Sequence, residues 1–343
     1  MSPSRPTVPF TYQDAVERYS GRRSLDRRLR DGDVCRLGRG IYAEPLTLGS
    51  ATETWVAHRT EHLHRLRAAL HRFPGMVASH TSAAVVHGLE LVIAAETPVE
   101  LTVVRGAPQS RSLPGVRIHH TDSTVTPHVL VDDIRTTTIA RTVADVLRTR
   151  RAPHAVAMTD RAVADGAVDL AGITAALDAQ VRWKGRPRAR ESLAAVDLRR
   201  ESWLESYSFV ALHEQGHPLP LPQVSVHDEH LRFVGRVDGL WPREKVFAEA
   251  DGEGKYFLGP GDQVPLEPET TVRRRLAEER ERHARLEALG LVGVRWTGEE
   301  IMNRPEAVAL RVELARERAR GMQFHGWVRR GADLVRLESL FAA

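Results

Sequence analysis

The chain of 343 residues contains a single cysteine, Cys35. One thiol excludes an internal disulfide bond and a zinc site built from clustered cysteines. No run of about 18 apolar residues occurs, so the sequence predicts no membrane-spanning helix. The opening segment, MSPSRPTVPF, lacks the apolar stretch of a signal peptide. These absences together predict a cytoplasmic protein with no membrane partner.

Lysine is also scarce, because it occurs only at Lys184, Lys245 and Lys255 among 49 lysine and arginine residues. The planar guanidinium of arginine suits paired hydrogen bonds to phosphate. An isoelectric point of about 9.5 and a formal net charge of +4 add modest support for a polyanionic partner. GC-rich coding produces the same arginine bias, so the placement of the charges decides more than their total.

The length of the chain predicts two or three domains, because one small hydrophobic core cannot serve so many residues. The apolar fraction of 42% and the charged fraction of 27% are ordinary for a globular protein. We expect domains at residues 1–50, 51–182 and 191–320. The middle domain has a mixed α and β pattern and no catalytic constellation. The segment WKGRPRAR, Trp183–Arg190, is predicted to be a connector, and the alternative is a loop that contributes phosphate contacts.

The first domain has the pattern of a small DNA-binding unit. Thr11, followed three residues later by Asp14, predicts the cap of a first helix. Ser24 is expected to cap a second helix, which stops at Gly32. The segment VCRLGRGIYA then predicts a β-hairpin with a glycine-rich tip. Helix, turn, basic helix and hairpin together predict a winged helix-turn-helix.

Arginines on the second helix and at the hairpin tip are the predicted DNA contacts. In a winged helix-turn-helix, the second helix enters the major groove and the wing reaches the backbone or the minor groove. The alternative is a solvated basic helix without a role in DNA binding, and the agreement of charge and motif favours DNA. The predicted DNA-binding residues are Arg22, Arg23, Arg27, Arg28 and Arg39.

Acidic residues gather in the segment GRVDGLWPREKVFAEADGEGKY, which begins at Gly235. Its pattern predicts two strands joined by a turn, with Asp238 at the end of the first strand. Because side chains alternate along a strand, Glu249 and Asp251 share one face of the second. Crowded carboxylates repel one another unless a cation lies among them, and Mg²⁺ is the usual one. The alternative is a solvated hairpin edge that carries charged residues.

Several blocks of the last domain resemble a nuclease family. The order helix, three strands, helix, strand, with acids on the first helix and on the second and third strands, resembles the PD-(D/E)xK restriction-endonuclease-like core. The blocks LES, GHPLPLPQV, GRVDGLW, AEADGEGKY and LEALGLVGVRW look like a Vsr-like (very-short-patch-repair-like) domain. The resemblance covers about residues 192–296.

This resemblance implies roles for five residues. Glu205, Asp238 and Glu249 would bind Mg²⁺, which activates a water and neutralises the scissile phosphate. Asp251 stands where the family has the lysine of its Glu-x-Lys motif, and it would bind a second metal or orient the water. Lys255 would supply the missing positive charge and stabilise the transition state. The alternative for Lys255 is a structural lysine.

The first half of the chain is similar to AbiEi-type antitoxins of abortive-infection toxin–antitoxin systems. The basic helix with RLGRGIYA matches their winged helix, and SHTSAAVVHGL and TTTIARTVADVL match blocks of the domain that follows. The resemblance implies binding to operator DNA, repression of the protein's own transcription, and a nucleotidyltransferase-type toxin as partner.

The sequence therefore predicts an α/β (α+β multidomain) protein that binds DNA and carries a Mg²⁺-dependent, endonuclease-like domain that cleaves phosphodiester bonds. The alternative is a non-enzymatic transcriptional regulator, an antitoxin of a type IV (AbiE-like) toxin–antitoxin system with a degenerate nuclease fold. The intact set of acids favours the enzyme, and the missing Glu-x-Lys lysine favours the regulator.

Overall fold

The computed structural model describes residues 9–38, 40–46, 54–105, 110–119, 121, 125–251 and 269–341. These residues form a mixed α/β protein with several helices and sheets, as the sequence predicts. The chain divides into two compact units, residues 1–151 with 165–191 and residues 152–164 with 192–343. Within the described residues, no helix combines the length and the apolar character needed to cross a membrane.

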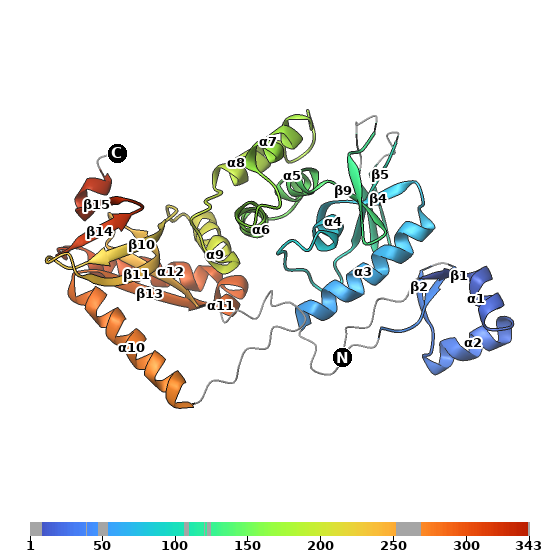
Figure 1. Cartoon of the computed structure of the whole chain (residues 1–343), viewed down its shortest axis with the longest axis horizontal. Coiled ribbons are helices and arrows are strands. Elements are labelled where there is room, and N and C mark those ends of the chain that lie inside the picture. Colours follow the sequence, from blue (N-terminus) through green and yellow to red (C-terminus); the bar gives the residue numbers. More distant parts are fainter. Residues whose placement is uncertain are drawn as a thin grey trace. The chain divides into compact units, whose positions relative to one another are not determined.

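The first unit begins with two helices and a small sheet (Figure 1). The elements are β1 (Phe10–Thr11), α1 (Tyr12–Arg18), α2 (Arg22–Asp31), β2 (Cys35–Gly38) and β3 (Ile41–Ala43), and the strands pair in the order β1-β3-β2. The predicted cap is confirmed, because the Thr11 side chain accepts from the Asp14 backbone and the Asp14 carboxylate accepts from the Thr11 backbone. Helix α2 begins earlier than Ser24, at Arg22, and ends at Gly32 in the left-handed conformation. The expected pair of helices followed by a hairpin is confirmed.

The rest of the first unit is a sheet flanked by helices. Its elements are α3 (Thr54–Arg72), β4 (Met76–Ala78), α4 (His80–Val86), β5 (Val99–Val103), β6 (Arg111–Leu113), β7 (Val116–His119), β8 (His128–Val131), β9 (Ile134–Thr137), α5 (Ile139–Thr149), α7 (Leu170–Asp178) and α8 (Arg186–Ala194). The strands lie in the order β6-β7-β5-β4-β9-β8. Leu66 of α3, Leu101 of β5 and Ile134 of β9 belong to the apolar core.

The second unit holds the predicted nuclease-like domain. Its elements are α6 (Ala152–Ala164), α9 (Trp203–Glu214), β10 (Leu221–His227), β11 (Phe233–Trp241), β12 (Val246–Asp251), α10 (Glu269–Ala288), β13 (Val292–Thr297), α11 (Gly298–Asn303), α12 (Pro305–Ala319), β14 (Trp327–Arg330), β15 (Asp333–Val335) and a 3-10 turn, η1 (Leu337–Phe341). The strands lie in the order β13-β12-β11-β10-β14-β15. The succession α9, β10, β11, β12, α10, β13 confirms the predicted order of helix, three strands, helix and strand (Figure 1).

Strand β11 is longer than the sequence predicts. It runs through Asp238 to Trp241, and it pairs antiparallel with β12 from Gly239 to Trp241. Asp238 therefore lies inside the strand and not at its end. The difference arises because Gly239-Leu240 continues the ladder on both sides, with β10 and with β12.

Candidate active site

Helix α9 presents Glu205 from its first turn. The Ser202 hydroxyl accepts a hydrogen bond from the Glu205 backbone N–H at 3.1 Å, which caps the helix. One carboxylate oxygen of Glu205, Oε2, accepts from the Glu201 N–H at 3.0 Å and from the Gln223 side-chain amide at 2.8 Å. The Glu205 carboxylate is thus buried and held in one orientation.

A glycine lets α9 pack closely on the sheet. A Cβ at Gly239 of β11 would lie 2.7 Å from Cζ of Phe209 on α9, closer than van der Waals contact allows. Since Phe209 follows Glu205 by one helical turn, this contact sets how near the Glu205 carboxylate lies to β11.

Asp238 and Glu249 lie on the neighbouring strands β11 and β12. The pairing of Gly239 with Ala248 continues to place Asp238 opposite Glu249. Asp238 Oδ2 accepts a hydrogen bond from the Ala250 backbone N–H at 2.9 Å. Three of the predicted acids, from one helix and two strands, therefore come together.

The three acids are close enough for two of them to change the pKa of the third. Burial raises the pKa of the Asp238 carboxyl, and repulsion from Glu205 and Glu249 raises it further, to about 7. The hydrogen bond from Ala250 and the charge of Arg282 oppose this shift in part. At neutral pH the Asp238 carboxyl therefore keeps its proton in part of the molecules, because burial and the two neighbouring acids disfavour its charged form.

Glu249 is buried and carries an ion pair that the sequence pattern did not reveal. Arg282 of α10 places Nη2 2.6 Å from Glu249 Oε1 and donates through Nη1 to the Arg236 carbonyl at 2.9 Å. Neither Glu249 oxygen accepts a hydrogen bond of good geometry from a described residue. The contact with Arg282 is therefore one of charge, and two buried carboxylate oxygens are left without a donor.

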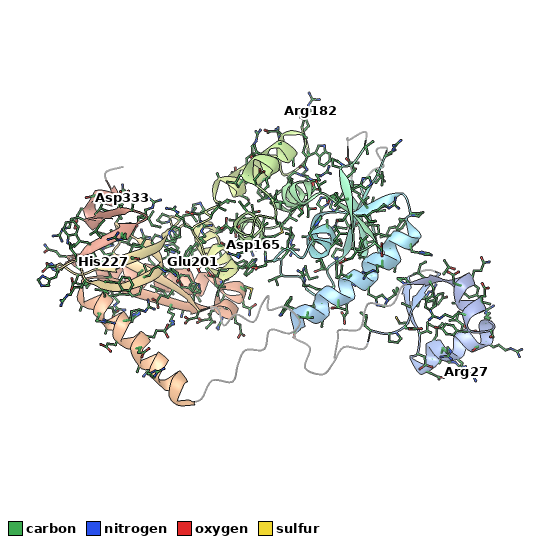
Figure 2. All side chains as sticks on the ribbon, in the orientation of Figure 1. Arg27, Asp165, Arg182, Glu201, His227 and Asp333 are labelled. Carbon is green, nitrogen blue, oxygen red and sulfur yellow. The ribbon has the colours of Figure 1, made fainter. Side chains whose placement is uncertain are left out.

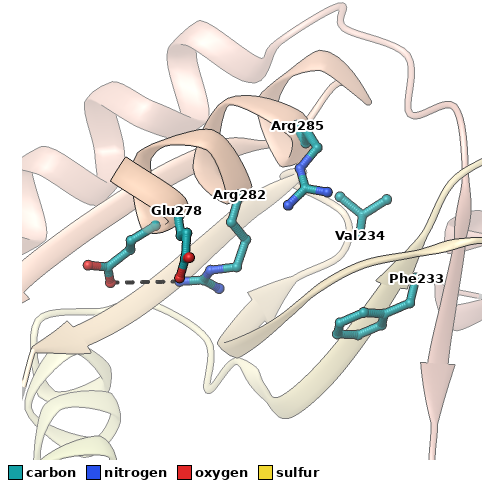
Figure 3. A pocket seen from close by; sticks show the side chains of 6 residues that line it. Phe233, Val234, Glu278, Arg282 and Arg285 are labelled. Carbon is teal, nitrogen blue, oxygen red and sulfur yellow. Dashed lines mark ion pairs between the residues drawn. The ribbon is translucent and has the colours of Figure 1, made fainter. Parts of the chain in front are cut away.

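Arg282 also borders a cavity of about 430 Å³, which Phe233, Val234, Glu278, Glu279 and Arg285 line with it. Figure 3 shows the Arg282 side chain extending from α10, with a dashed ion pair that joins it to a glutamate of the same helix. The Arg282 side chain is about a quarter exposed, at 27%. It can therefore move without the unfolding of buried structure.

Gln223 is a second residue that sequence reasoning missed. It lies in β10, in the ladder between Pro222 and Val224, yet its φ of +54° is in the left-handed region. That conformation is unfavourable for a residue other than glycine, and such strained residues are often found at functional sites. Here the strained backbone accompanies the hydrogen bond from the Gln223 amide to the Glu205 carboxylate.

Of the remaining two predicted site residues, Asp251 is engaged elsewhere. Asp251, at the end of β12, pairs with Arg295 of β13, which also pairs with Glu279. These contacts raise the pKa of the Arg295 guanidinium against the effect of burial. Lys255 lies outside the described residues.

The ligand atoms of the cluster are of the type that a hard cation prefers, but the side chains are not arranged around a common point. Among the described residues, no three His, Cys, Asp or Glu side chains are arranged to hold one metal ion. Carboxylate oxygens are nevertheless the ligands that Mg²⁺ prefers. The unbonded oxygens of Glu249 and the raised pKa of Asp238 are both features that a bound cation would relieve.

The predicted DNA-binding arginines of α2 are exposed. Arg22, Arg23, Arg27 and Arg28 all face solvent, and Arg27 is labelled in Figure 2. Arg22 lies 3.8 Å from Asp26, and Arg28 lies 3.4 Å from Asp33. Arg39, at the hairpin tip, lies outside the described residues.

No protein-family model matches the chain. Two proteins of Mycobacterium tuberculosis are similar to it, "Uncharacterized protein MT2308" of strain CDC 1551 / Oshkosh and "Uncharacterized protein Rv2248" of strain ATCC 25618 / H37Rv. Each is 27% identical over 303 residues, which make up 87% of this chain and 98% of the relative. The similarity thus extends over most of this chain, and the relatives' names carry no activity.

Proposed function

We propose that this is a DNA-binding protein whose second unit hydrolyses phosphodiester bonds with the help of Mg²⁺. The observation that carries the proposal is the meeting of Glu205, Asp238 and Glu249, with the pKa of Asp238 raised by the other two. Buried carboxylates that repel one another are costly unless a cation joins them. A cation site is the simplest chemical use of such a cluster.

Each residue of the cluster has a role in this proposal. Glu205, Asp238 and Glu249 hold the metal. When bound, Mg²⁺ lowers the pKa of a water and offsets the charge of the scissile phosphate. The Gln223 amide keeps Glu205 oriented through the 2.8 Å hydrogen bond. Arg282 brings positive charge to the acid cluster, since its guanidinium already contacts Glu249.

In this proposal the first unit binds the DNA. The exposed arginines of α2 contact phosphates, and Arg23 and Arg27 lie on the face of the helix opposite to the buried Leu25. Phosphate contacts position a protein on DNA without selecting a sequence. The same contacts predict a strong dependence of binding on salt.

Titration calorimetry with MgCl₂ tests the metal site. The wild-type chain is expected to release or absorb heat on saturation, and the double variant Asp238→Ala/Glu249→Ala is expected to show none. The matched control is Glu313→Ala/Glu317→Ala, which removes two exposed carboxylates from α12 of the same unit. Equal heats from the wild type and the site variant would remove the metal site.

Cleavage assays with Mg²⁺ and double-stranded DNA then test the reaction. Asp238→Ala is expected to abolish cleavage while DNA binding stays at the wild-type level, because the arginines of α2 belong to the other unit. Cleavage that remains in this variant would contradict the assignment of Asp238.

A second function, a DNA-binding regulator of antitoxin type, is favoured by one observation. Arginines already pair with two of the predicted acids, Arg282 with Glu249 and Arg295 with Asp251. Under this proposal the second unit binds a protein partner, such as a nucleotidyltransferase-type toxin, and holds no metal. Salt-sensitive DNA binding without Mg²⁺ heat or cleavage would support the regulator over the enzyme.

A further inference from the structure

The first unit contains a cavity of about 900 Å³ with a strongly basic lining. Its cationic residues come from strand β7, helix α5, the segment that leads into α8, and the first turn of α8. No aspartate or glutamate is among the described residues that line it. The cationic lining residues are Arg117, Arg148, Arg182, Lys184 and Arg188. We call this cavity the basic pocket.

The segment WKGRPRAR forms one wall of the basic pocket and is fixed to the end of α5. Arg148 donates through Nη1 to the Lys184 carbonyl at 2.9 Å, and Arg188 donates to the Arg148 carbonyl. Gly185 has a φ of +84°, and a Cβ there would overlap the Arg148 carbonyl oxygen. This wall is therefore held in place by backbone contacts that only glycine at position 185 allows.

A buried carboxylate lies behind this wall. Asp145 accepts from Arg148 Nη2 at 2.7 Å, from Arg141 Nε at 2.8 Å and from Gln180 Nε2 at 2.9 Å. The two guanidiniums lie over the ring of Trp183, at 4.6 Å for Arg141 and 4.9 Å for Arg148. Burial opposes ionisation of Asp145, but the neighbouring positive charges lower its pKa to about 2.

A second buried carboxylate holds the opposite wall. Glu100 of β5 accepts from His119 Nε2 at 3.0 Å and from the Thr81 backbone N–H at 3.0 Å. Arg117 lies 3.5 Å from the same carboxylate. His80, whose pKa burial lowers to about 3, stacks on His119 with ring centroids 3.5 Å apart. Glu100 and His80 thus fix the two β7 side chains that line the basic pocket.

The two buried carboxylates do more than stabilise the fold. Burying charges costs solvation energy that a well-made ion pair only roughly recovers, so stability alone does not explain such a network. Its geometric effect is to lock Arg148, His119 and Arg117 in place before any ligand arrives. Arg148 Nε and Arg141 Nη2 are buried and find no acceptor among the described residues. The preset arrangement of Arg148, His119 and Arg117 is what a wall that binds an anion requires.

We propose that the basic pocket binds the phosphate groups of a small molecule of about nucleotide size. The lining has five cationic side chains, of which Arg117 and Arg148 contact the two buried carboxylates, so it keeps a surplus of positive charge. Guanidiniums match phosphate oxygens through paired hydrogen bonds. A cavity of this volume lies in the range of pockets that enclose small ligands. Among the lining residues, Arg182, which Figure 2 labels, and Lys184 are exposed and would meet the ligand first.

The test is titration calorimetry of the full chain with ATP, with pyrophosphate and with ribose 5-phosphate, all in EDTA. The chelator keeps divalent cations away from the carboxylates of the second unit, so failure here leaves the nuclease proposal untouched. The variant Arg182→Glu/Lys184→Glu reverses two exposed charges and is expected to bind at least about tenfold more weakly, as for the loss of charge-assisted hydrogen bonds. The three probes separate a nucleotide from a bare phosphate and from a sugar phosphate.

The matched control is Arg329→Glu/Arg330→Glu, which makes the same change of net charge at exposed positions of the second unit. Unchanged affinity in the control, with loss in the pocket variant, supports the basic pocket. Equal losses in both would show attraction by net charge alone and overturn the proposal, as would binding of none of the probes. Gly185→Ala gives an independent check, because it displaces the wall without removing a charge and is expected to weaken binding.

Discussion

Asp238 carries the most perturbed carboxyl of the acid cluster, and its behaviour follows from where it stands. Its backbone position in the middle of β11 prevents it from moving away from Glu205 and Glu249. Burial and two neighbouring carboxylates raise its pKa to about 7. The unfolded chain has no such repulsion, so the pKa of the Asp238 carboxyl in the unfolded state is near the ordinary value of about 3.9.

The raised pKa of Asp238 predicts a loss of stability as pH rises. Between about pH 4 and pH 7 the folded protein binds this proton and the unfolded chain does not, so the free energy of unfolding falls through that window. The full effect is at most about 4 kcal/mol, from the shift of roughly three pKa units. Asp238→Asn removes the titration, so we expect this variant to exceed the wild type in stability at pH 8 and to match it at pH 4.

Urea unfolding of the full chain in EDTA at pH 4, 6 and 8 measures this difference. Asp333→Asn, an exposed carboxyl on β15 of the same unit, serves as the control. A constant difference between Asp238→Asn and wild type at all three pH values would contradict the raised pKa.

At the scale of helices and strands, the sequence predicts the features that depend on local signals and misses those that depend on long-range contacts. Thr11 with Asp14 predicts its helix cap because both partners lie within one turn. The order of elements around Glu205, Asp238 and Glu249 was also predicted, because each element has its own hydrophobic periodicity and its own capping or turn residues. The length of β11 was not, because Gly239 and Leu240 acquire strand partners only from the ladders on either side.

The residues that escaped prediction all depend on partners distant in sequence. Arg282 meets Glu249 only once α10 folds back on the sheet, and Gln223 reaches Glu205 only through the pairing of β10 with β11. Asp145 and Arg141 do stand one turn apart on α5, but Gln180 joins them from 35 positions away. The basic pocket was anticipated only as an alternative role for WKGRPRAR.

The contact between α9 and β11 predicts the effect of a methyl group at position 239. In Gly239→Ala the Cβ would lie 2.7 Å from Phe209 Cζ and 3.1 Å from Pro220 Cγ. Overpacking of this kind costs about 1–3 kcal/mol. We expect the variant to unfold at lower urea concentration and to bind Mg²⁺ more weakly, because α9 must carry Glu205 away from the strands.

Gly75→Ala is the matched substitution for this prediction. Gly75 is exposed, and a Cβ there meets nothing within 4 Å. Its unfolding midpoint should stay close to the wild type. An equally small effect at Gly239 would show that the helix and sheet adjust to the methyl group without cost.

At the scale of the whole molecule, the two units divide the expected work on DNA. Under the proposed function, the exposed arginines of α2 bind DNA, and the acid cluster belongs to the other unit. Replacing Arg27 and Arg28 by alanine should therefore weaken DNA binding without touching the Mg²⁺ heat. If both contact phosphate, the slope of log affinity against log salt concentration becomes shallower by about 2.

Filter binding or fluorescence anisotropy with a DNA duplex over a range of NaCl concentrations measures this slope. Arg329→Ala/Arg330→Ala removes the same charge from the second unit and should leave the slope unchanged. An unaltered slope in the α2 variant would place the phosphate contacts elsewhere on the chain.

Lys184 stands at the rim of the basic pocket in a chain where almost every other cation is arginine. Acylating reagents modify amines and spare guanidiniums, so the side chains open to them are few. Lys184 is exposed, Lys245 is half-buried, and Lys255 lies outside the described residues. Mass spectrometry of briefly acetylated protein can therefore follow one wall of the pocket through a single peptide. The scarcity of lysine thus makes Lys184 a natural site for chemical labelling beside the basic pocket.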